Sequence, residues 1–449
     1  MKPEQQDLTR GPLGKQIFWF SVPLIFSNLL QVLFNMTDVA VVGRFAGPLA
    51  LGAVGSTVTL VTLFTGFLIG LSGGVNVLTA LHFGARDRTE LSDTVHSAAV
   101  VCALAGMCLL MIGVIFARPI LVLLHTKEEL LEGAVLYLRI YFLGMPALGI
   151  YNFGNAVFSA VGDTKRPLCY LSAAGAVNVV LNLFFVIVCG MDVAGVAVAS
   201  VISQYISAIL VAAALFRAQA GYGLRRTELR LHGSRTRAIL RIGVPAGLQS
   251  CIFALANLFT QVGVNSFDAV LVAGNSAAAN ADALVYGAMD AVYIACGSFI
   301  GQNYGARQKA RIKKSYLISV GYSFGFGLAL GLLLLTLGPL FLSLFTKEPA
   351  VVEAGMKRLA IMSLSYCVSA FMDCTIAASR GLGKSLAPTV IVILGSCVFR
   401  VAWIYTVFAY FRTIPSLYLL YVCSWTLTAI AEIAYFLHVY HHQLAELEP

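Results

Sequence analysis

The chain has 449 residues, of which 59% are hydrophobic and 11% charged, and its mean hydropathy is +0.85. Because soluble domains carry about 25% charged residues, this composition excludes a water-soluble globular protein. The apolar residues are continuous rather than alternating, which excludes the strands of a transmembrane barrel. A membrane-spanning helix needs about 20 mainly apolar residues, and blocks of that length recur about twelve times.

The sequence therefore predicts an all-α membrane protein with twelve spans. In chain order they cover residues 16–42, 50–80, 92–117, 131–156, 167–190, 193–217, 237–267, 273–301, 315–343, 350–378, 386–411 and 415–440. The longest polar connection, residues 218–236, follows the sixth span and contains four arginines. It separates an N-terminal lobe, residues 1–217, from a C-terminal lobe, residues 237–449.

Loop charge predicts the orientation. With the N-terminus in the cytoplasm, only seven of the 30 Lys and Arg residues lie on the opposite face. Because Lys and Arg concentrate in cytoplasmic loops, we expect a multi-pass protein of the cytoplasmic membrane with both termini cytoplasmic. The same loop bias explains the net charge of +9, so the charge does not indicate a nucleic-acid partner.

The two lobes repeat each other at a shift near 221 residues. The landmarks that correspond are Gly84-Ala85-Arg86 with Gly305-Ala306-Arg307, Gly162 and Pro167 with Gly383 and Pro388, Thr126-Lys127 with Thr346-Lys347, and Pro23 with Pro245. Each lobe has an even number of spans, so both enter the membrane from one side and form parallel repeats. Transporters built this way bind substrate between the repeats.

Ionisable side chains inside spans are candidate functional residues, since an Asp at the bilayer centre costs about 2.5–3.5 kcal/mol on insertion scales. The acids are Asp38 in span one, Asp282 and Asp290 in span eight, Asp373 in span ten and Glu432 in span twelve. The alternative for each is a structural salt bridge or an interhelical hydrogen bond. Arg139 and Arg400 also lie within spans, where either pairs an acid such as Asp373 or extends to the interface.

Amides cluster in the same lobe as Asp38. They are Asn152 and Asn155 in span four and Asn178 and Asn182 in span five. Amide oxygens beside one carboxylate suit a hard cation such as sodium. Interhelical hydrogen bonding is the alternative. Asn152 corresponds to Asp373 at a shift of 221, and Asp38 corresponds to Thr260 at a shift of 222, so the acids differ between the lobes.

Five motifs resemble the multidrug and toxic compound extrusion (MATE) family. They are Asp38-Val-Ala-Val-Val-Gly-Arg44, Phe83-Gly-Ala-Arg86, Val161-Gly-Asp-Thr-Lys-Arg-Pro167, Gly301-Gln-Asn-Tyr-Gly-Ala306 and Ser379-Arg-Gly-Leu-Gly383. Each motif is weak alone, but five in order on a duplicated twelve-span frame are specific. The resemblance implies two six-helix bundles around a V-shaped cleft and cation-driven export of organic, often cationic, compounds.

The resemblance also implies the site residues. One branch of the family has a cation-coupling site in the N-terminal lobe that falls here on Asp38, Asn152, Asn178, Asn182 and Ser200, with sodium expected at Asp38, Asn178 and Asn182. Asn182 departs from that branch, which has Asp there. Another branch uses acids of spans seven and ten in the C-terminal lobe. Asp373 resembles the span-ten acid, but span seven has only amides, among them Asn257 and Gln261, so Asp282 is expected to take the place of its acid. Arg400 completes this second set.

The predicted function is a cation-coupled antiporter, driven by sodium or protons, that exports small organic cations. We expect a monomer in the lipid bilayer without catalytic residues or cofactors. The first alternative is a flippase or exporter of a lipid-linked precursor on the same duplicated frame, which a basic cleft would favour over an acidic one. A membrane-embedded enzyme is the remote alternative.

Overall fold

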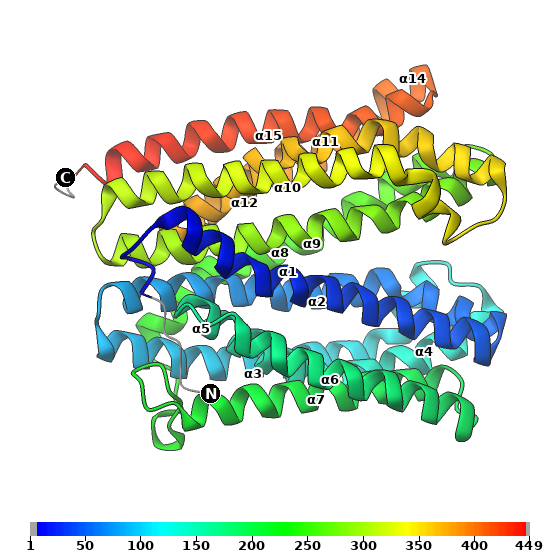
Figure 1. The fold of residues 1–449 in the computed structure, drawn as a ribbon. Coiled ribbons are helices and arrows are strands. Elements are labelled where there is room, and N and C mark those ends of the chain that lie inside the picture. The colour runs from blue at the N-terminus through cyan, green and yellow to red at the C-terminus, as the bar shows by residue number, and fades with distance from the viewer. Residues whose placement is uncertain (1–6, 446–449) are drawn as a thin grey trace. The chain divides into compact units, whose positions relative to one another are not determined.

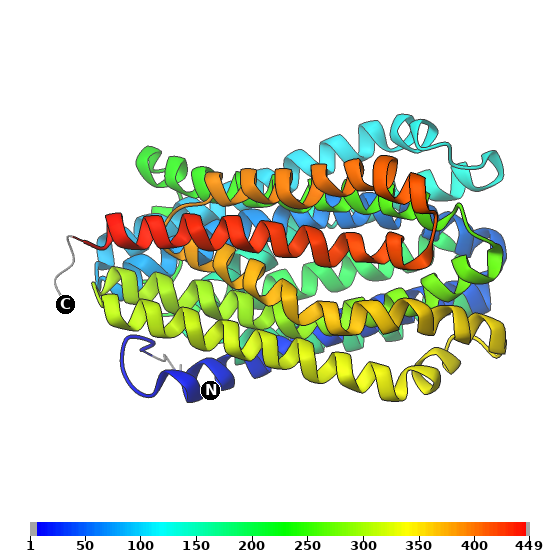
Figure 2. The same ribbon diagram turned by 90° about the horizontal axis from the view of Figure 1, so that it is seen from above.

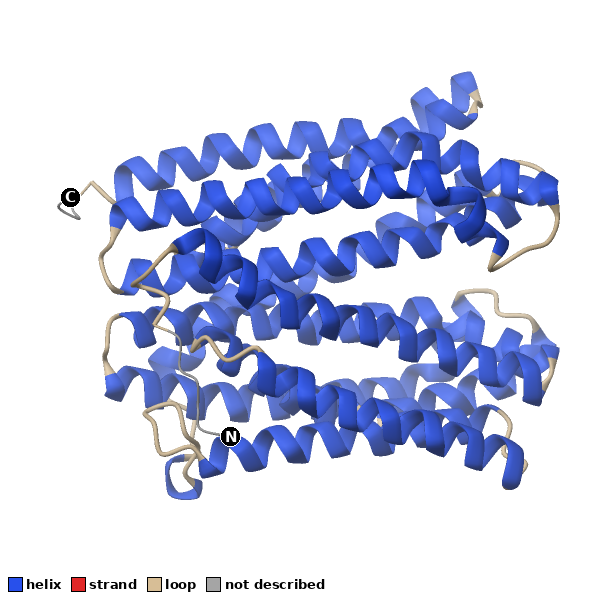
Figure 3. Cartoon of the chain, in the orientation of Figure 1, coloured by secondary structure: helices blue, strands red, loops and turns tan. Residues whose placement is uncertain are grey.

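The computed structural model describes residues 7–445, and within them the chain forms helices and loops without a strand (Figure 3). Eleven described helices are long and apolar enough to cross a membrane. A bent pair, α4 (Glu128–Phe142) and α5 (Met145–Ala160), makes a twelfth span. The predicted all-α membrane protein with twelve spans is therefore confirmed.

The other elements follow the predicted spans closely (Figure 1). They are α1 (Leu13–Val41), η1 (Val42–Ala46), α2 (Pro48–Gly84), α3 (Arg88–Leu123), α6 (Lys165–Leu183), η2 (Phe184–Val188), α7 (Val193–Arg217), η3 (Arg226–Glu228), α8 (Gly233–Val264), α9 (Ala269–Gly305), α10 (Lys309–Ser343), α11 (Pro349–Gly381), α12 (Leu386–Val392), η4 (Ile393–Val398), α13 (Phe399–Trp403), η5 (Ile404–Phe408), α14 (Ala409–Phe411) and α15 (Ile414–Gln443). The elements η1, η2, η4 and η5 are π-helical, and η3 is a short 3₁₀ helix.

The fourth span is broken, where the sequence predicts one continuous helix over 131–156. Its two parts meet at 47° around Leu143 and Gly144. Pro146 lies in the first turn of α5. Because proline has no backbone N–H and its ring clashes with the preceding turn, it cannot continue α4. It is well suited to beginning a new helix instead.

The chain packs as two units. Unit 1 comprises residues 26–251, and unit 2 comprises residues 7–25 together with 252–445. The packing units differ from the predicted lobes at two places. The first part of α1 packs with unit 2, and the first part of α8 packs with unit 1.

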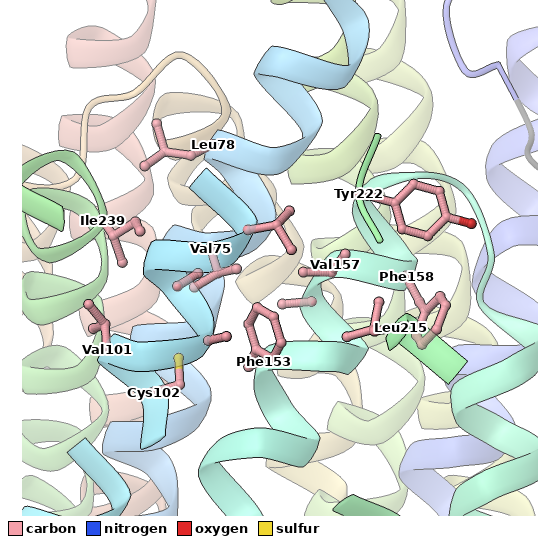
Figure 4. Close-up of a cluster of buried hydrophobic side chains, with 14 of the residues drawn as sticks. Val75, Leu78, Val101, Cys102, Phe153, Val157, Phe158, Leu215, Tyr222 and Ile239 are labelled. Atoms are coloured by element: carbon pink, nitrogen blue, oxygen red, sulfur yellow. The ribbon is translucent and has the colours of Figure 1, made fainter. Parts of the chain in front are cut away.

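The core of unit 1 joins most of its helices. Val75 of α2, Val101 of α3, Phe153 of α5 and Leu215 of α7 are buried in one cluster (Figure 4). Tyr222, from the connection after α7, is also buried there, with only 1% of its surface exposed. The predicted basic linker is therefore anchored to unit 1 through an aromatic side chain.

Hydrogen bonds fix the rest of that connection to α3. The Arg225 amide donates to Nε2 of His96 at 2.9 Å, and Ser92 donates to Glu228 at 3.1 Å. The His232 amide donates to the Ser97 hydroxyl at 3.0 Å. Hydrogen bonds from Arg225 and Ser92 lower the pKa of Glu228.

Unit 2 is built on close helix contacts, and α15 lies beside α11 (Figures 1 and 2). A Cβ added to Gly331 of α10 would lie 1.9 Å from the backbone oxygen of Ser363 of α11. One added to Gly274 of α9 would lie 2.6 Å from the backbone nitrogen of Gly355. Small residues let membrane helices approach closely, and van der Waals packing then holds them.

The N-terminal segment docks on the motif that begins at Gly301. Leu8 is fully buried, and its amide donates to the Gln302 side chain at 3.1 Å. The Leu8 carbonyl accepts from Asn303 at 3.3 Å and from Arg311 at 3.1 Å. These bonds satisfy backbone groups that burial would otherwise leave unpaired.

Candidate functional site

Asp38 is the centre of a polar cluster in unit 1. It lies on α1 one turn before the π-helical segment η1, and its carboxylate accepts two hydrogen bonds. Asn182 of α6 donates to Oδ1, and Ser200 of α7 donates to Oδ2 at 3.2 Å. The structure therefore brings together three of the residues that the family resemblance places in a cation site.

Asn178 extends the cluster by one helical turn. Its side-chain oxygen accepts from Nδ2 of Asn182 at 3.2 Å, as expected for residues four apart on one helix face. Asn182 is fully buried, and its Oδ1 has no hydrogen-bond partner among residues 7–445. A buried oxygen without a donor is costly, and a cation or a proton bound at Asp38 would give it a partner.

A cavity of about 370 Å³ lies within unit 1 against this cluster. That volume is within the roughly 300–1,000 Å³ typical of small-molecule sites. Asp38, Asn178, Ser200 and Asn152 all line it. Asn152 does not contact the carboxylate; its Nδ2 donates instead to the Leu148 carbonyl at 2.9 Å.

The cavity also contains polar and aromatic residues that the sequence reasoning missed. These are Gln31, Asn35, Tyr137, Tyr141, Tyr151 and Gln204. Gln31, Asn35 and Asp38 are spaced at 4 and 3 residues, so they share one face of α1. That spacing was visible in the sequence and places all three side chains along the cavity.

In unit 2, Asp282 is held in a buried ion pair. Arg358 of α11 donates to one carboxylate oxygen, and Tyr366 donates to the other. Arg358 also donates to Asn275 at 2.8 Å, and Tyr418 donates to the same amide oxygen at 2.7 Å. Sequence reasoning left open whether Asp282 is functional or paired, and the structure shows the pair.

Arg400 lies apart from this network. Its Nε donates to Ser424 at 3.3 Å, and its Nη1 donates to the Asn257 side chain at 3.2 Å. No carboxylate lies within 4.0 Å of it among the described residues, so the pairing with Asp373 considered from sequence is not formed. Gln261, from the same predicted set, donates to Asn265 at 2.8 Å on the exposed side of α8.

Two further acids of unit 2 also lack an ion pair within 4.0 Å in the described part of the chain. Asp373 of α11 interacts electrostatically with Asp290, Arg400 and Arg380. Glu432 of α15 is fully buried, and neither of its oxygens has a hydrogen-bond partner in residues 7–445. Unit 2 therefore has several ionisable side chains within its helices, whereas the polar cluster of unit 1 is built around one, Asp38.

Fold and site together define a duplicated, multi-pass membrane protein whose two repeats carry different polar clusters. The chain belongs to the MatE family, whose model matches residues 23–184 and again 245–406. The two matches begin 222 residues apart, at Pro23 and Pro245, which agrees with the shift near 221 found in the sequence.

Similar proteins cover nearly the same length. The chain is 27% identical to "Probable multidrug resistance protein YpnP" of Bacillus subtilis over 80% of both chains. It is 23% identical to a protein named "FAD transporter" of Shewanella oneidensis over 81% of both. A solved structure of a multidrug resistance MATE family transporter, titled as an outward-facing conformation, matches with a TM-score of 0.91 at 21% identity, covering 100% of this chain and 99% of that one.

Proposed function

We propose that this protein is a cation-coupled antiporter that exports small organic cations across the cytoplasmic membrane, with both termini cytoplasmic. One observation carries the proposal: a single carboxylate, Asp38, lies at a cavity of about 370 Å³ within a membrane-spanning unit. The multidrug resistance names of relatives support export of small molecules. One relative is named for the transport of FAD instead.

Coupling rests on competition for the Asp38 carboxylate. When the carboxylate is charged and binds no coupling ion, it accepts hydrogen bonds from Asn182 and Ser200. Its negative charge then attracts an organic cation in the cavity. A proton on Asp38 removes that charge and converts an acceptor into a donor. A sodium ion requires Asn182 to turn an oxygen toward it.

Either ion changes the hydrogen bonds that join α1 to α6 and α7. An ion shifts a conformational equilibrium only when it binds the two states with different affinity. Asp38 meets this condition if the hydrogen bonds from Asn182 and Ser200 are present in one state and absent in the other. Asp373 of unit 2, which has no ion pair within residues 7–445, is a second candidate for the same role.

The test is efflux of a fluorescent organic cation from proteoliposomes under an imposed sodium gradient and, separately, an imposed pH gradient. We expect Asp38→Asn to abolish efflux driven by both. Asp192→Asn is the matched control, because Asp192 is exposed and its side chain caps no helix. Efflux by Asp38→Asn at the wild-type rate would overturn the assignment. The gradient that drives wild-type efflux identifies the ion.

A further inference from the structure

The polar cluster of unit 1 has a counterpart in unit 2 with the opposite charge. At the 222-residue shift between the two family matches, Asp38 corresponds to Thr260 and Asn178 corresponds to Arg400. Asn35 corresponds to Asn257 at the same shift. The acid of unit 1 is thus replaced by a hydroxyl, and the amide that neighbours it is replaced by a guanidinium.

Arg400 is positioned as part of a built site. It is 3% exposed and makes two hydrogen bonds, to Asn257 and Ser424. A guanidinium has five N–H donors, so most of them have no acceptor among the described residues. A buried charge without a bonded counter-charge is costly, and Asp373 acts on Arg400 only from beyond 4.0 Å.

Aromatic side chains surround the guanidinium. Its central carbon lies 4.6 Å from the ring centre of Tyr421, 5.5 Å from that of Phe253 and 5.9 Å from that of Trp425. Ring faces stabilise a cation by about 0.5–2 kcal/mol each. They offer no lone pair in the plane of the guanidinium, so they hold the charge in place and leave its N–H donors available.

The backbone around Arg400 is irregular. α13, which carries it, is five residues long and lies between the π-helical segments η4 and η5. At the 222-residue shift, η5 falls on residues 182–186 and overlaps η2 of unit 1, but η4 falls inside the regular helix α6. A π-helical segment one turn before Arg400 is therefore found in unit 2 and not at the equivalent place in unit 1. Such turns occur frequently at functional sites.

We propose that Arg400 is an anion-binding site that takes the carboxylate of the transported molecule. A carboxylate binds a guanidinium through two parallel hydrogen bonds, which matches the donors that Arg400 has available. Asn257, which accepts from Arg400, is exposed, so the hydrogen-bonded pair reaches the surface of unit 2. This inference rests on the proposed transport function and deepens it: the preferred substrates are amphoteric and carry, besides their cationic group, an acidic group that binds Arg400.

Two dyes that differ in one group test this. Rhodamine 110 carries a free carboxylate, and rhodamine 123 is its methyl ester on the same cationic ring system. Equilibrium binding to the purified full-length protein is measured by fluorescence anisotropy. We expect the wild type to bind the acid about tenfold more tightly than the ester, because a charge-assisted hydrogen bond contributes enough for that ratio.

Arg400→Met should bring the two affinities together while the ester still binds as in the wild type, which also reports that the variant is folded. Arg400→Lys keeps the charge but loses the planar fork, so it should retain only part of the preference. Arg139→Met is the matched control, since Arg139 is an exposed arginine of α4. It should leave the preference unchanged.

Equal affinity of the wild type for both dyes, or a preference that survives Arg400→Met, would overturn the proposal. The same measurement in detergent micelles with added phosphatidylglycerol tests whether Arg400 binds a lipid headgroup instead of a substrate carboxylate. Displacement of rhodamine 110 by this lipid in the wild type, and not in Arg400→Met, would assign the site to lipid and also overturn it. Binding needs no ion gradient, so a failure of coupling at Asp38 leaves this result intact.

Discussion

The ion pair of Asp282 and Arg358 allows a prediction about stability in which the two partners are not equivalent. Arg358 is almost fully buried, with 6% of its side chain exposed, whereas 25% of the Asp282 side chain is exposed. In Asp282→Asn, the guanidinium remains charged, because arginine does not lose its proton in proteins. In Arg358→Met, the remaining carboxylic acid can take up a proton and keep its bond from Tyr366.

Removing one partner of a buried pair costs about 3–5 kcal/mol. We expect Asp282→Asn to cost about 3 kcal/mol, at the low end, because two acceptors of Asn275 still bind Arg358. Arg358→Met should cost about 2 kcal/mol, within the roughly 1.5–3 kcal/mol of a lost hydrogen bond to a charged group. The double variant buries neither charge and should be within about 1 kcal/mol of the wild type, since uncharged replacements are often neutral.

The assay is reversible unfolding in mixed micelles of the four proteins in the cycle. Lys357 and Glu353 provide a control cycle on the same helix, since that pair is exposed and should couple by less than about 1 kcal/mol. Equal costs for the two single variants, or costs that add in the double variant, would refute the reasoning. If the double variant also exports substrate normally, Asp282 serves packing rather than transport.

Two further predictions concern packing and the connection between α7 and α8. Gly331→Ala should destabilise the protein by about 1–3 kcal/mol, because the new methyl group would overlap the Ser363 backbone, whereas Gly321→Ala meets nothing within 4 Å and should be neutral or stabilising. Equal melting temperatures of the two variants would contradict the close helix contact. Glu228 has a lowered pKa, so its bonds are complete above the ordinary Glu pKa of about 4.3 and are lost as pH falls through the lower folded value. The carboxyl carbon resonance of Glu228 should report a pKa below the ordinary value in the wild type and one nearer to it in Arg225→Met, which removes the guanidinium donor.

Spans and repeat are readable from the sequence because each depends on local composition. Twenty apolar residues specify a span wherever they occur, and Pro23 and Pro245 mark the register of the repeat without any knowledge of contacts. The break of the fourth span was equally local. Pro146 was visible, but many membrane helices tolerate a proline, so its presence alone does not decide between a kink and a break.

The polar sites depend on partners far apart in the chain. Asp38 and Asn182 are 144 residues apart, and only the family resemblance placed them together. Asp282 meets Arg358 across 76 residues, and no local pattern identifies that arginine as its partner. The surroundings of Arg400 come from α8, α13 and α15, so the sequence alone did not reveal which groups it meets.

The docking of the N-terminal segment on unit 2 has a consequence for biosynthesis. Leu8 bonds to Gln302, which is 294 positions later in the chain. At about 5–20 residues per second, ribosomes need roughly 15–60 s to make the intervening chain. During that interval the first span has no docking partner for its beginning, although its later part can already pack with unit 1. Unit 2 cannot be completed until residues 7–25 join helices that are synthesised much later, so a chaperone or insertase that shields this early segment would influence the yield of folded protein.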